Sequence, residues 1–236
     1  SIKKFKILRG LILSGVCFEG GNKRFLKSLI LLKNEILNNF NEEGVHISRV
    51  PSAQLSILGD LVTMRDIIMA AKKDVPEYLS AQIKKTAHSL RFFRTLDGSL
   101  CTFNGSKRET KFVVDKILNA ADGKARGKGP LTLIKTGYEK LVVPEACVLI
   151  DSFSSSNKSF SKTPHAIEVY IGKQRLLGSC GSSFSKNYDW KKILKSTAAH
   201  STVSIEDSDA FIGFDSNQKS YSKRYTQNGS ELIELI

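Results

Sequence analysis

Residues 90–105 read LRFFRTLDGSLCTFNG, and this stretch separates two parts of the chain that differ in hydrophobic period. Before it, apolar residues recur every three or four positions, which is typical of amphipathic helices. After the turn dipeptide Asp97-Gly98, apolar and polar residues tend to alternate, which is typical of strands. The sequence therefore predicts an α+β chain in which a helical part precedes an antiparallel β part.

The helical part is expected to contain three clear amphipathic helices. The first covers residues 26–40 after a Gly-Gly-Asn break, the second follows Pro51 with Ser52 as its cap, and the third opens at Pro76. The connection over residues 41–51 is polar. Because loops held by rigid helices often carry function, we expect functional side chains there.

The β part consists of short runs of β-favouring residues separated by Gly, Ser, Asn and Lys clusters. A helix over residues 109–121 is expected before it, and the serine-rich residues 152–161 are expected to form a loop. The expected strands cover residues 131–143, 146–150, 166–171, 174–180 and 201–205. This pattern divides the chain into a helical domain over residues 1–98, a linker over residues 99–129, and a β domain over residues 130–236.

Composition places the chain among folded proteins. It has 236 residues, of which 41% are hydrophobic and 25% charged, and the longest uninterrupted apolar run is far shorter than the ~20 residues of a membrane span. The formal net charge of +13 favours an anionic partner: nucleic acid, acidic lipid or acidic polysaccharide. Because the charge is spread over both halves of the chain, solvated surface is the simpler interpretation. Nucleic acid is not expected, since no groove-reading motif is present.

The four cysteines, at positions 17, 101, 147 and 180, are far apart and lack metal-ligand spacing. Buried free thiols are the expectation, and no cofactor is predicted. A structural zinc or calcium ion stays open at this point. The chain starts without Met or a signal-peptide pattern and ends within an apolar alternation, so we expect a fragment. The compartment, periplasm or cytoplasm of a bacterium, and the oligomeric state are not predicted.

Several segments together resemble the heparinase II/III-like family. Residues 90–105 are similar to its RFFRxxDGxLxxFNG segment, and GVHISRVPSAQ at residues 44–54 is similar to its GGHxSRxPxxQ segment. The segments TGYEKL (136–141), PHAIE (164–168) and AAHST (198–202) follow in the expected order. The resemblance implies the C-terminal part of an (α/α) toroid followed by an antiparallel, incomplete β-sandwich. An incomplete toroid should leave apolar side chains of its first helices exposed.

The resemblance also implies a polysaccharide lyase that cleaves a uronate-containing glycan by β-elimination, such as a glycosaminoglycan or alginate. The chemical difficulty is removal of the C5 proton beside an ionised carboxylate. A cationic or amide group must stabilise the enolate while a base removes the proton. The alternative is a non-catalytic glycan-binding or structural member of the family, and the fragment by itself is expected to be inactive.

Eight residues are the candidates for this site. The expected catalytic residues, from the β part, are His165 and His200. The expected substrate-binding residues are His46, Arg49, Arg91, Arg94, Asn104 and Tyr138. Each has a structural alternative: a hydrogen-bonded histidine at a strand end, a salt-linked loop, or, for Tyr138, cross-strand packing. We expect the two catalytic histidines to approach one another at the edge facing the loop of His46 and Arg49.

The sequence departs from the family's lyase pattern in two places. Ala53 lies where active relatives often carry a tyrosine, and Glu168 lies where they carry a second histidine. Both differences favour the non-catalytic alternative. His88, on the third helix, is expected to be structural, and no zinc ligand set is recognisable around His165.

Overall fold

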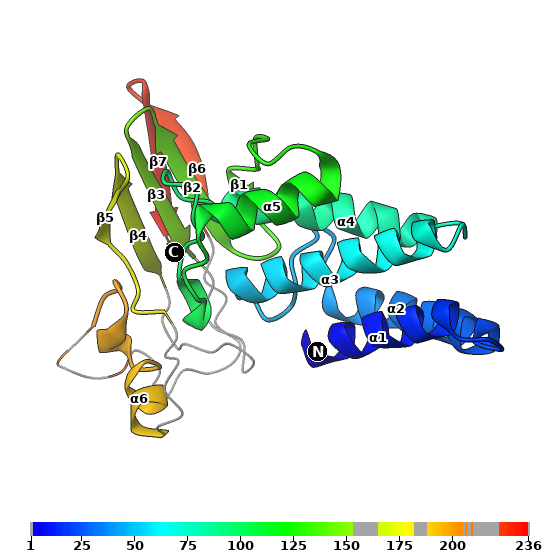
Figure 1. The fold of residues 1–236 in the computed structure, drawn as a ribbon. Coiled ribbons are helices and arrows are strands. Elements are labelled where there is room, and N and C mark those ends of the chain that lie inside the picture. The colour runs from blue at the N-terminus through cyan, green and yellow to red at the C-terminus, as the bar shows by residue number, and fades with distance from the viewer. Residues whose placement is uncertain are drawn as a thin grey trace.

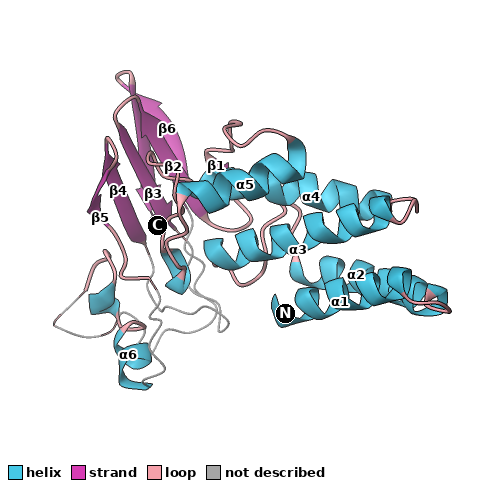
Figure 2. Ribbon diagram, in the orientation of Figure 1, coloured by secondary structure: helices cyan, strands magenta, loops and turns pink. Residues whose placement is uncertain are grey.

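The computed structural model describes residues 2–152, 165–181, 188–204, 206, 209 and 222–235. Helices form one side of the molecule and a sheet stands beside them (Figures 1 and 2). The helices are α1 (Ile2–Cys17), α2 (Asn22–Asn39), α3 (Pro51–Ala70), α4 (Glu77–Leu90), α5 (Lys111–Asp122) and α6 (Tyr188–Ile193). Short 3₁₀ turns lie at Arg91–Phe93, Phe103–Gly105 and Thr197–Ala199. Within the described ranges, no helix is both long enough and apolar enough to cross a membrane.

The three expected amphipathic helices correspond to α2, α3 and α4, and the short expected helix corresponds to α5. The cap expected at Ser52 is wrong, because α3 already begins at Pro51 and its N-cap is Val50. Proline suits the first helical position since its missing N–H has no helical acceptor there. Ser52 instead joins the linker: its N–H donates to Ser106 Oγ at 3.0 Å, and its Oγ accepts from Lys107 N–H at 3.1 Å.

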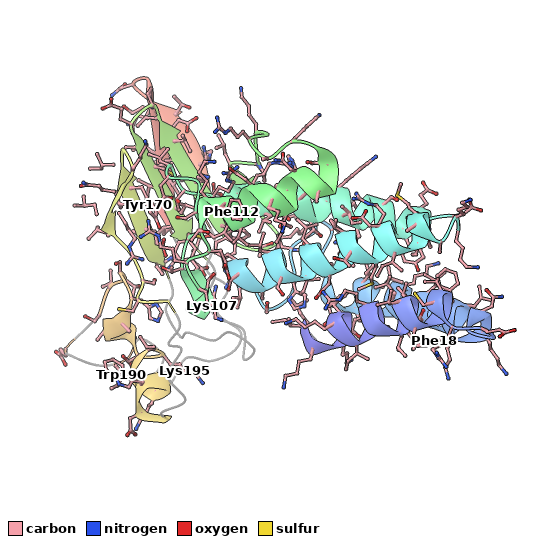
Figure 3. All side chains as sticks on the ribbon, in the orientation of Figure 1. Phe18, Lys107, Phe112, Tyr170, Trp190 and Lys195 are labelled. Atoms are coloured by element: carbon pink, nitrogen blue, oxygen red, sulfur yellow. The ribbon has the colours of Figure 1, made fainter. Side chains whose placement is uncertain are left out.

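Helix α3 forms the centre of the helical part, with α1 and α2 on one side and α4 and α5 on the other (Figure 1). Its Ile57, Leu58, Leu61 and Met64 are fully buried, which explains why it is apolar around most of its circumference. The outer helices are different. The expected exposure of apolar side chains on the first helices is confirmed for Ile7, Leu13, Leu26, Ile30 and Leu37, and Phe18 at the end of α1 is exposed too (Figure 3).

The main sheet is antiparallel in the order β1-β2-β3-β4-β5. Its strands are β1 (Thr132–Leu133), β2 (Tyr138–Val143), β3 (Ala146–Asp151), β4 (Ala166–Ile171) and β5 (Gln174–Leu177). The antiparallel expectation is confirmed. Tyr138 pairs with Asp151, which pairs with Ala166, so these three side chains lie on one face.

That face packs against the stretch that divides the sequence. The ring of Tyr138 is fully buried and contacts the rings of Phe92, Phe93 and Phe103, with centroids 5.0–5.8 Å apart. Aromatic contacts of this kind contribute about 0.5–1.5 kcal/mol each beyond the burial of their area. The RFF segment therefore joins the helices to the sheet through an aromatic cluster.

A separate hairpin, β6 (Ser222–Gln227) and β7 (Ser230–Leu235), covers part of the opposite face. Arg224 of β6 forms an ion pair with Glu139 at 3.2 Å and donates to the carbonyl of Lys140 at 2.5 Å. Glu139 alternates with Tyr138 along β2, so it points away from the helices. The β part thus begins a second layer, as a sandwich requires.

Three sequence expectations in the β part need correction. The single strand expected over residues 131–143 is divided into β1 and β2, because residues 134–137 form a turn in which Gly137 N–H donates to the carbonyl of Leu133 at 2.8 Å. Residues 201–204 form no strand, because Thr197–Ala199 is a 3₁₀ turn and Thr202 N–H folds back to the carbonyl of His200 at 3.1 Å. Strand β5 ends at Leu177 rather than at residue 180. Helix α6 was not predicted. Of the serine-rich loop, residues 153–161 lie outside the described residues.

Candidate functional site

The site begins with Arg49 in the loop between α2 and α3. Its backbone is left-handed, with φ of 55°, a conformation that costs a non-glycine residue about 1 kcal/mol or more. The turn directs the guanidinium to the Asp151 carboxylate at the end of β3, while Nε donates to the carbonyl of Thr136 at 3.1 Å. The guanidinium carbon also lies 4.6 Å from the centre of the Tyr138 ring. Arg49 therefore links the helical part to the sheet.

Asn104 completes this junction from the 3₁₀ turn after the aromatic segment. It too has a left-handed backbone, with φ of 54°, which asparagine tolerates better than most residues. Its amide nitrogen lies 2.7 Å from Tyr138 Oη and 3.0 Å from Asp151 Oδ2, and the Tyr138 hydroxyl donates to the carbonyl of Arg49 at 2.9 Å. We call Arg49, Asn104, Tyr138 and Asp151 the junction network.

Burial controls the electrostatics of the junction network. Desolvation opposes the charge of Arg49, but the adjacent Asp151 more than offsets it and raises the pKa of the guanidinium. Burial raises the pKa of Tyr138 well above its usual range despite the nearby guanidinium. Tyr138 is therefore a protonated hydrogen-bond donor at neutral pH, and as placed it cannot serve as a base.

His165 lies just before β4, with a left-handed backbone of φ 57°. The residue is partly exposed, but its Nδ1 is buried and has no hydrogen-bond partner among the described residues. Burial lowers the pKa of His165, and the Asp151 carboxylate acts in the opposite direction. The imidazole is therefore neutral at pH 7 and is close enough to Asp151 to respond to its charge. Its catalytic role stays a prediction.

His200 lies beside the start of β4, because Ile167 N–H donates to the carbonyl of Ser201 at 2.8 Å. Its Nε2 is 3.1 Å from the carbonyl of Leu194, so Nε2 carries the proton and Nδ1 is a buried acceptor. Burial lowers the pKa of this histidine as well. The two histidine segments are thus neighbours, but the expected approach of the two rings stays a prediction.

His46 and Arg49 were expected to act as a pair, and the structure turns them in different directions. The His46 ring is 1% exposed and packs against Phe5 and Phe40 in the helical core. Ser48 N–H donates to its Nδ1 at 3.1 Å, and burial lowers its pKa to about 4. A neutral ring in this position packs against the phenylalanines of the helical core. That His46 binds substrate stays a prediction, and its buried position does not support it.

Arg91 and Arg94 lie away from the junction network. Arg91 forms an ion pair with Asp122, and Arg94 forms one with Asp115, each at 2.6 Å. Both arginines also donate to backbone carbonyls of the linker after α5. These contacts hold the linker against the helices, and they give the two arginines a structural role in addition to the expected binding role.

Sequence reasoning missed several polar residues that the fold brings together. Asp151 was not singled out, although a carboxylate ending the apolar run Cys-Val-Leu-Ile was a usable signal. Glu168 was noted only as a departure from the family, yet it is fully buried and accepts from Thr102 at 2.6 Å and Tyr170 at 2.6 Å. Within the described ranges no three His, Cys, Asp or Glu side chains gather to hold a metal ion.

Known proteins match this chain in sequence and in fold. Residues 126–234 match the family model described as "Heparinase II/III-like, C-terminal". A curated relative, FtsZ-localized protein C from Caulobacter vibrioides, is 29% identical over 175 residues, which is 71% of this chain and 29% of the relative. The chain therefore spans less than a third of that protein.

Solved structures share the fold. A heparinase III gene product superposes with a TM-score of 0.73 at 13% identity over 92% of this chain. Heparan sulfate lyase HepC from Pedobacter heparinus superposes with a TM-score of 0.73 at 14% identity over 97% of this chain. In both cases the match covers 40% of the other chain. The toroid-plus-sandwich expectation is confirmed as a partial fold.

Proposed function

We propose, from the match of residues 126–234 to the heparinase II/III-like C-terminal model, that the whole protein is a polysaccharide lyase acting on a uronate-containing, sulfated or unsulfated glycan. The observation that carries the proposal is His165, an imidazole whose pKa is lowered by burial and responds to the charge of Asp151, with a buried Nδ1 that is unpaired among the described residues. A neutral imidazole can accept a proton, which is the first requirement of β-elimination.

The reaction fixes the role of each group. The base takes the C5 proton, the electron pair forms a C4=C5 double bond, and the bond from C4 to the glycosidic oxygen breaks. A second acid returns a proton to that oxygen. We assign the base to His165. His200, whose segment runs beside β4, is kept as the candidate acid on the condition that its Nε2–H leaves the carbonyl of Leu194 during the reaction.

The uronate carboxylate also needs a neutralising group. Arg49 is bound to Asp151 and to the carbonyl of Thr136, and Asn104 is bound within the junction network. We therefore place Arg49 and Asn104 in a positioning role, in which they fix Asp151 beside His165. The neutralising group is expected from the rest of the protein, since this chain spans 40% of the heparinase III and HepC chains that it resembles.

A second candidate function is a non-catalytic one, in which the fold binds an acidic glycan or a protein partner without cleaving it. Three observations favour it: Tyr138 is fully buried, Ala53 and Glu168 depart from the lyase pattern, and a curated relative is named for its localisation with FtsZ. The two functions make different predictions for one assay.

The test uses the full-length protein on a panel of uronate polysaccharides, with the absorbance of the unsaturated product as readout. His165→Asn is the informative variant, because asparagine tolerates the left-handed backbone but cannot act as a general base. Turnover should fall by about 10²-fold to 10⁴-fold. His88→Asn, which alters an exposed histidine on α4, is the matched control and should leave turnover unchanged.

Thermal unfolding of both variants separates a catalytic effect from a folding defect. Wild-type turnover by a folded His165→Asn variant would refute the catalytic assignment. Retention on an immobilised uronate glycan, with no unsaturated product from any substrate, would support the non-catalytic function instead.

A further inference from the structure

A cavity lies between the helical part and the sheet, apart from the junction network. Its volume is about 740 Å³, within the range of small-molecule sites. It is lined by residues 91 and 94–98, the linker residues 126–131, Lys111 of α5, and Lys140, Val142 and Cys147 of the sheet. None of these residues belongs to the junction network, so the cavity is a separate feature of the molecule.

The lining of this cavity is strongly cationic. Its cations are Arg91, Arg94, Lys111, Arg126, Lys128 and Lys140. Asp122 neutralises Arg91, but Asp115 is shared between Arg94 and Lys111. Within the part of the chain that the structure describes, Arg126 and Lys128 form no ion pair. Asp97, which also lines the cavity, pairs with Arg108, so these three carboxylates offset only part of the positive charge of the six cations.

Lys140 is the buried cation of the site. Lys140 is 9% exposed, and its ammonium group donates to the carbonyl of Phe92 at 2.8 Å and to the carbonyl of Arg94 at 2.6 Å. An ammonium has three donors, so one donor remains after these two bonds. No carboxylate among the described residues pairs with it, and burial lowers its pKa. An anion in the cavity would stabilise this charge directly.

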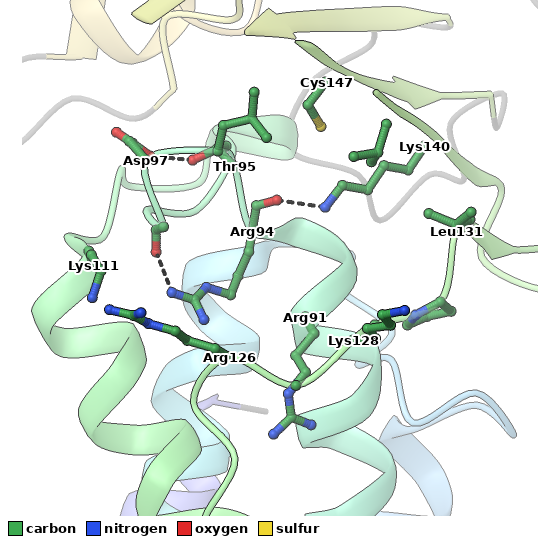
Figure 4. A pocket seen from close by; sticks show the side chains of 16 residues that line it. Arg91, Arg94, Thr95, Asp97, Lys111, Arg126, Lys128, Leu131, Lys140 and Cys147 are labelled. Carbon is green, nitrogen blue, oxygen red and sulfur yellow. Dashed lines mark hydrogen bonds between the residues drawn. The ribbon is translucent and has the colours of Figure 1, made fainter. Parts of the chain in front are cut away.

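The remaining walls are apolar. Leu96, Leu131, Val142 and Cys147 line the cavity alongside the cations. Figure 4 shows Lys140 and Lys128 on one side of the cavity and Lys111 and Arg126 on the other, with Arg94 between them. Such a site suits a ligand that has an organic body and an anionic group towards each side.

We propose that this cavity binds a small organic ligand bearing two tetrahedral oxyanions, present as phosphate or sulfate esters. One group would lie near Lys128 and Lys140, and the other near Arg94 and Arg126. Arginine forks and lysine ammonium groups are the side chains that bind such oxyanions best. The inference does not depend on glycan cleavage, because it uses neither catalytic histidine and no member of the junction network; of the residues expected to bind substrate, only Arg91 and Arg94 also line this cavity.

Isothermal titration calorimetry on the full-length protein tests the inference with two probes, inorganic triphosphate and a disulfated disaccharide. The variant is Arg126→Gln/Lys128→Gln, because both side chains lack ion-pair partners among the described residues and their loss should not disturb folding. The control is Lys23→Gln/Lys27→Gln, which removes two exposed lysines of α2 and the same net charge.

The cavity variant should bind at least one probe about tenfold or more weakly, whereas the control should change affinity by less than about twofold. The probe that binds more tightly identifies phosphate or sulfate as the natural group. Equal affinities of the two variants, or no heat of binding from either probe with the wild-type protein, would overturn the inference.

Discussion

The junction network offers the sharpest energetic prediction. Replacing Asp151 by Asn keeps the shape of the side chain but leaves the Arg49 guanidinium without its carboxylate. Both side chains are more than nine-tenths buried, so water cannot replace the lost partner. Removing one member of such a pair typically costs about 3–5 kcal/mol. We expect Asp151→Asn to lie in that range.

Replacing both charges should cost far less than the sum of the single changes. Arg49→Met keeps an unbranched chain over the Tyr138 ring, and in Arg49→Met/Asp151→Asn no buried charge is left alone. The amide oxygen introduced in the double variant can still accept from Asn104, which lies 3.0 Å from Asp151 Oδ2 in the wild type. We therefore expect a coupling energy of about 2–4 kcal/mol between the two positions.

The assay is equilibrium urea unfolding of the full-length protein, followed by circular dichroism, for the wild type, both single variants and the double variant. Lys4 and Glu35 form the control cycle, because in their 3.2 Å pair the Lys4 side chain is 66% exposed and stays solvated, although the Glu35 side chain is 11% exposed. Exposed pairs contribute about 0–1 kcal/mol. If the losses of unfolding free energy in the two single variants at Arg49 and Asp151 add up to that of the double variant within about 0.5 kcal/mol, as expected for the control pair, the reasoning is refuted.

Two further predictions concern the helical part. The pKa of buried His46 is about 4, below its value of about 6.5 in unfolded chains, so between these two pH values only the unfolded state binds a proton. The free energy of unfolding should therefore fall by about 3 kcal/mol from pH 7 to pH 4. In urea unfolding at each pH, His46→Phe should make this pH dependence weaker. Gly44→Ala should cost several times more than Gly172→Ala in urea unfolding. Both glycines have positive φ, but a Cβ at Gly44 would lie 2.6 Å from the carbonyl carbon of Lys85, whereas a Cβ at Gly172 would meet open space. Equal losses of unfolding free energy in the two variants would contradict the packing argument.

The helices and strands were predictable where the apolar period was long and regular. Residues 26–40 and 51–68 repeat with the period of a helix, and residues 146–150 and 166–171 fit strands, because burial of one face is a local property of the sequence. The failures lie where no such period exists. The segment 188–204 folds into α6 and a 3₁₀ turn, and its short polar pattern does not distinguish these from a strand.

The candidate site was predicted less completely. Arg49, Asn104 and Tyr138 were all identified, and the structure brings them together, but they form a buried network with Asp151 rather than an open binding surface. The left-handed backbone of Arg49 and Asn104 could not be predicted from the sequence, because neither residue is a glycine. His46 was paired with Arg49 because the loop is polar, yet the ring completes the helical core.

By itself the sequence determined that helices precede strands, that residues 90–105 join them, and that the chain resembles the heparinase II/III-like family. Only the tertiary structure decided which charges meet. Arg49 and Asp151 are 102 positions apart, and their contact depends on the register of β2 with β3 and on a loop turn that places one guanidinium. A local period specifies which residues are buried, but the pairing of buried charges depends on how separate elements pack, because water can no longer solvate them individually.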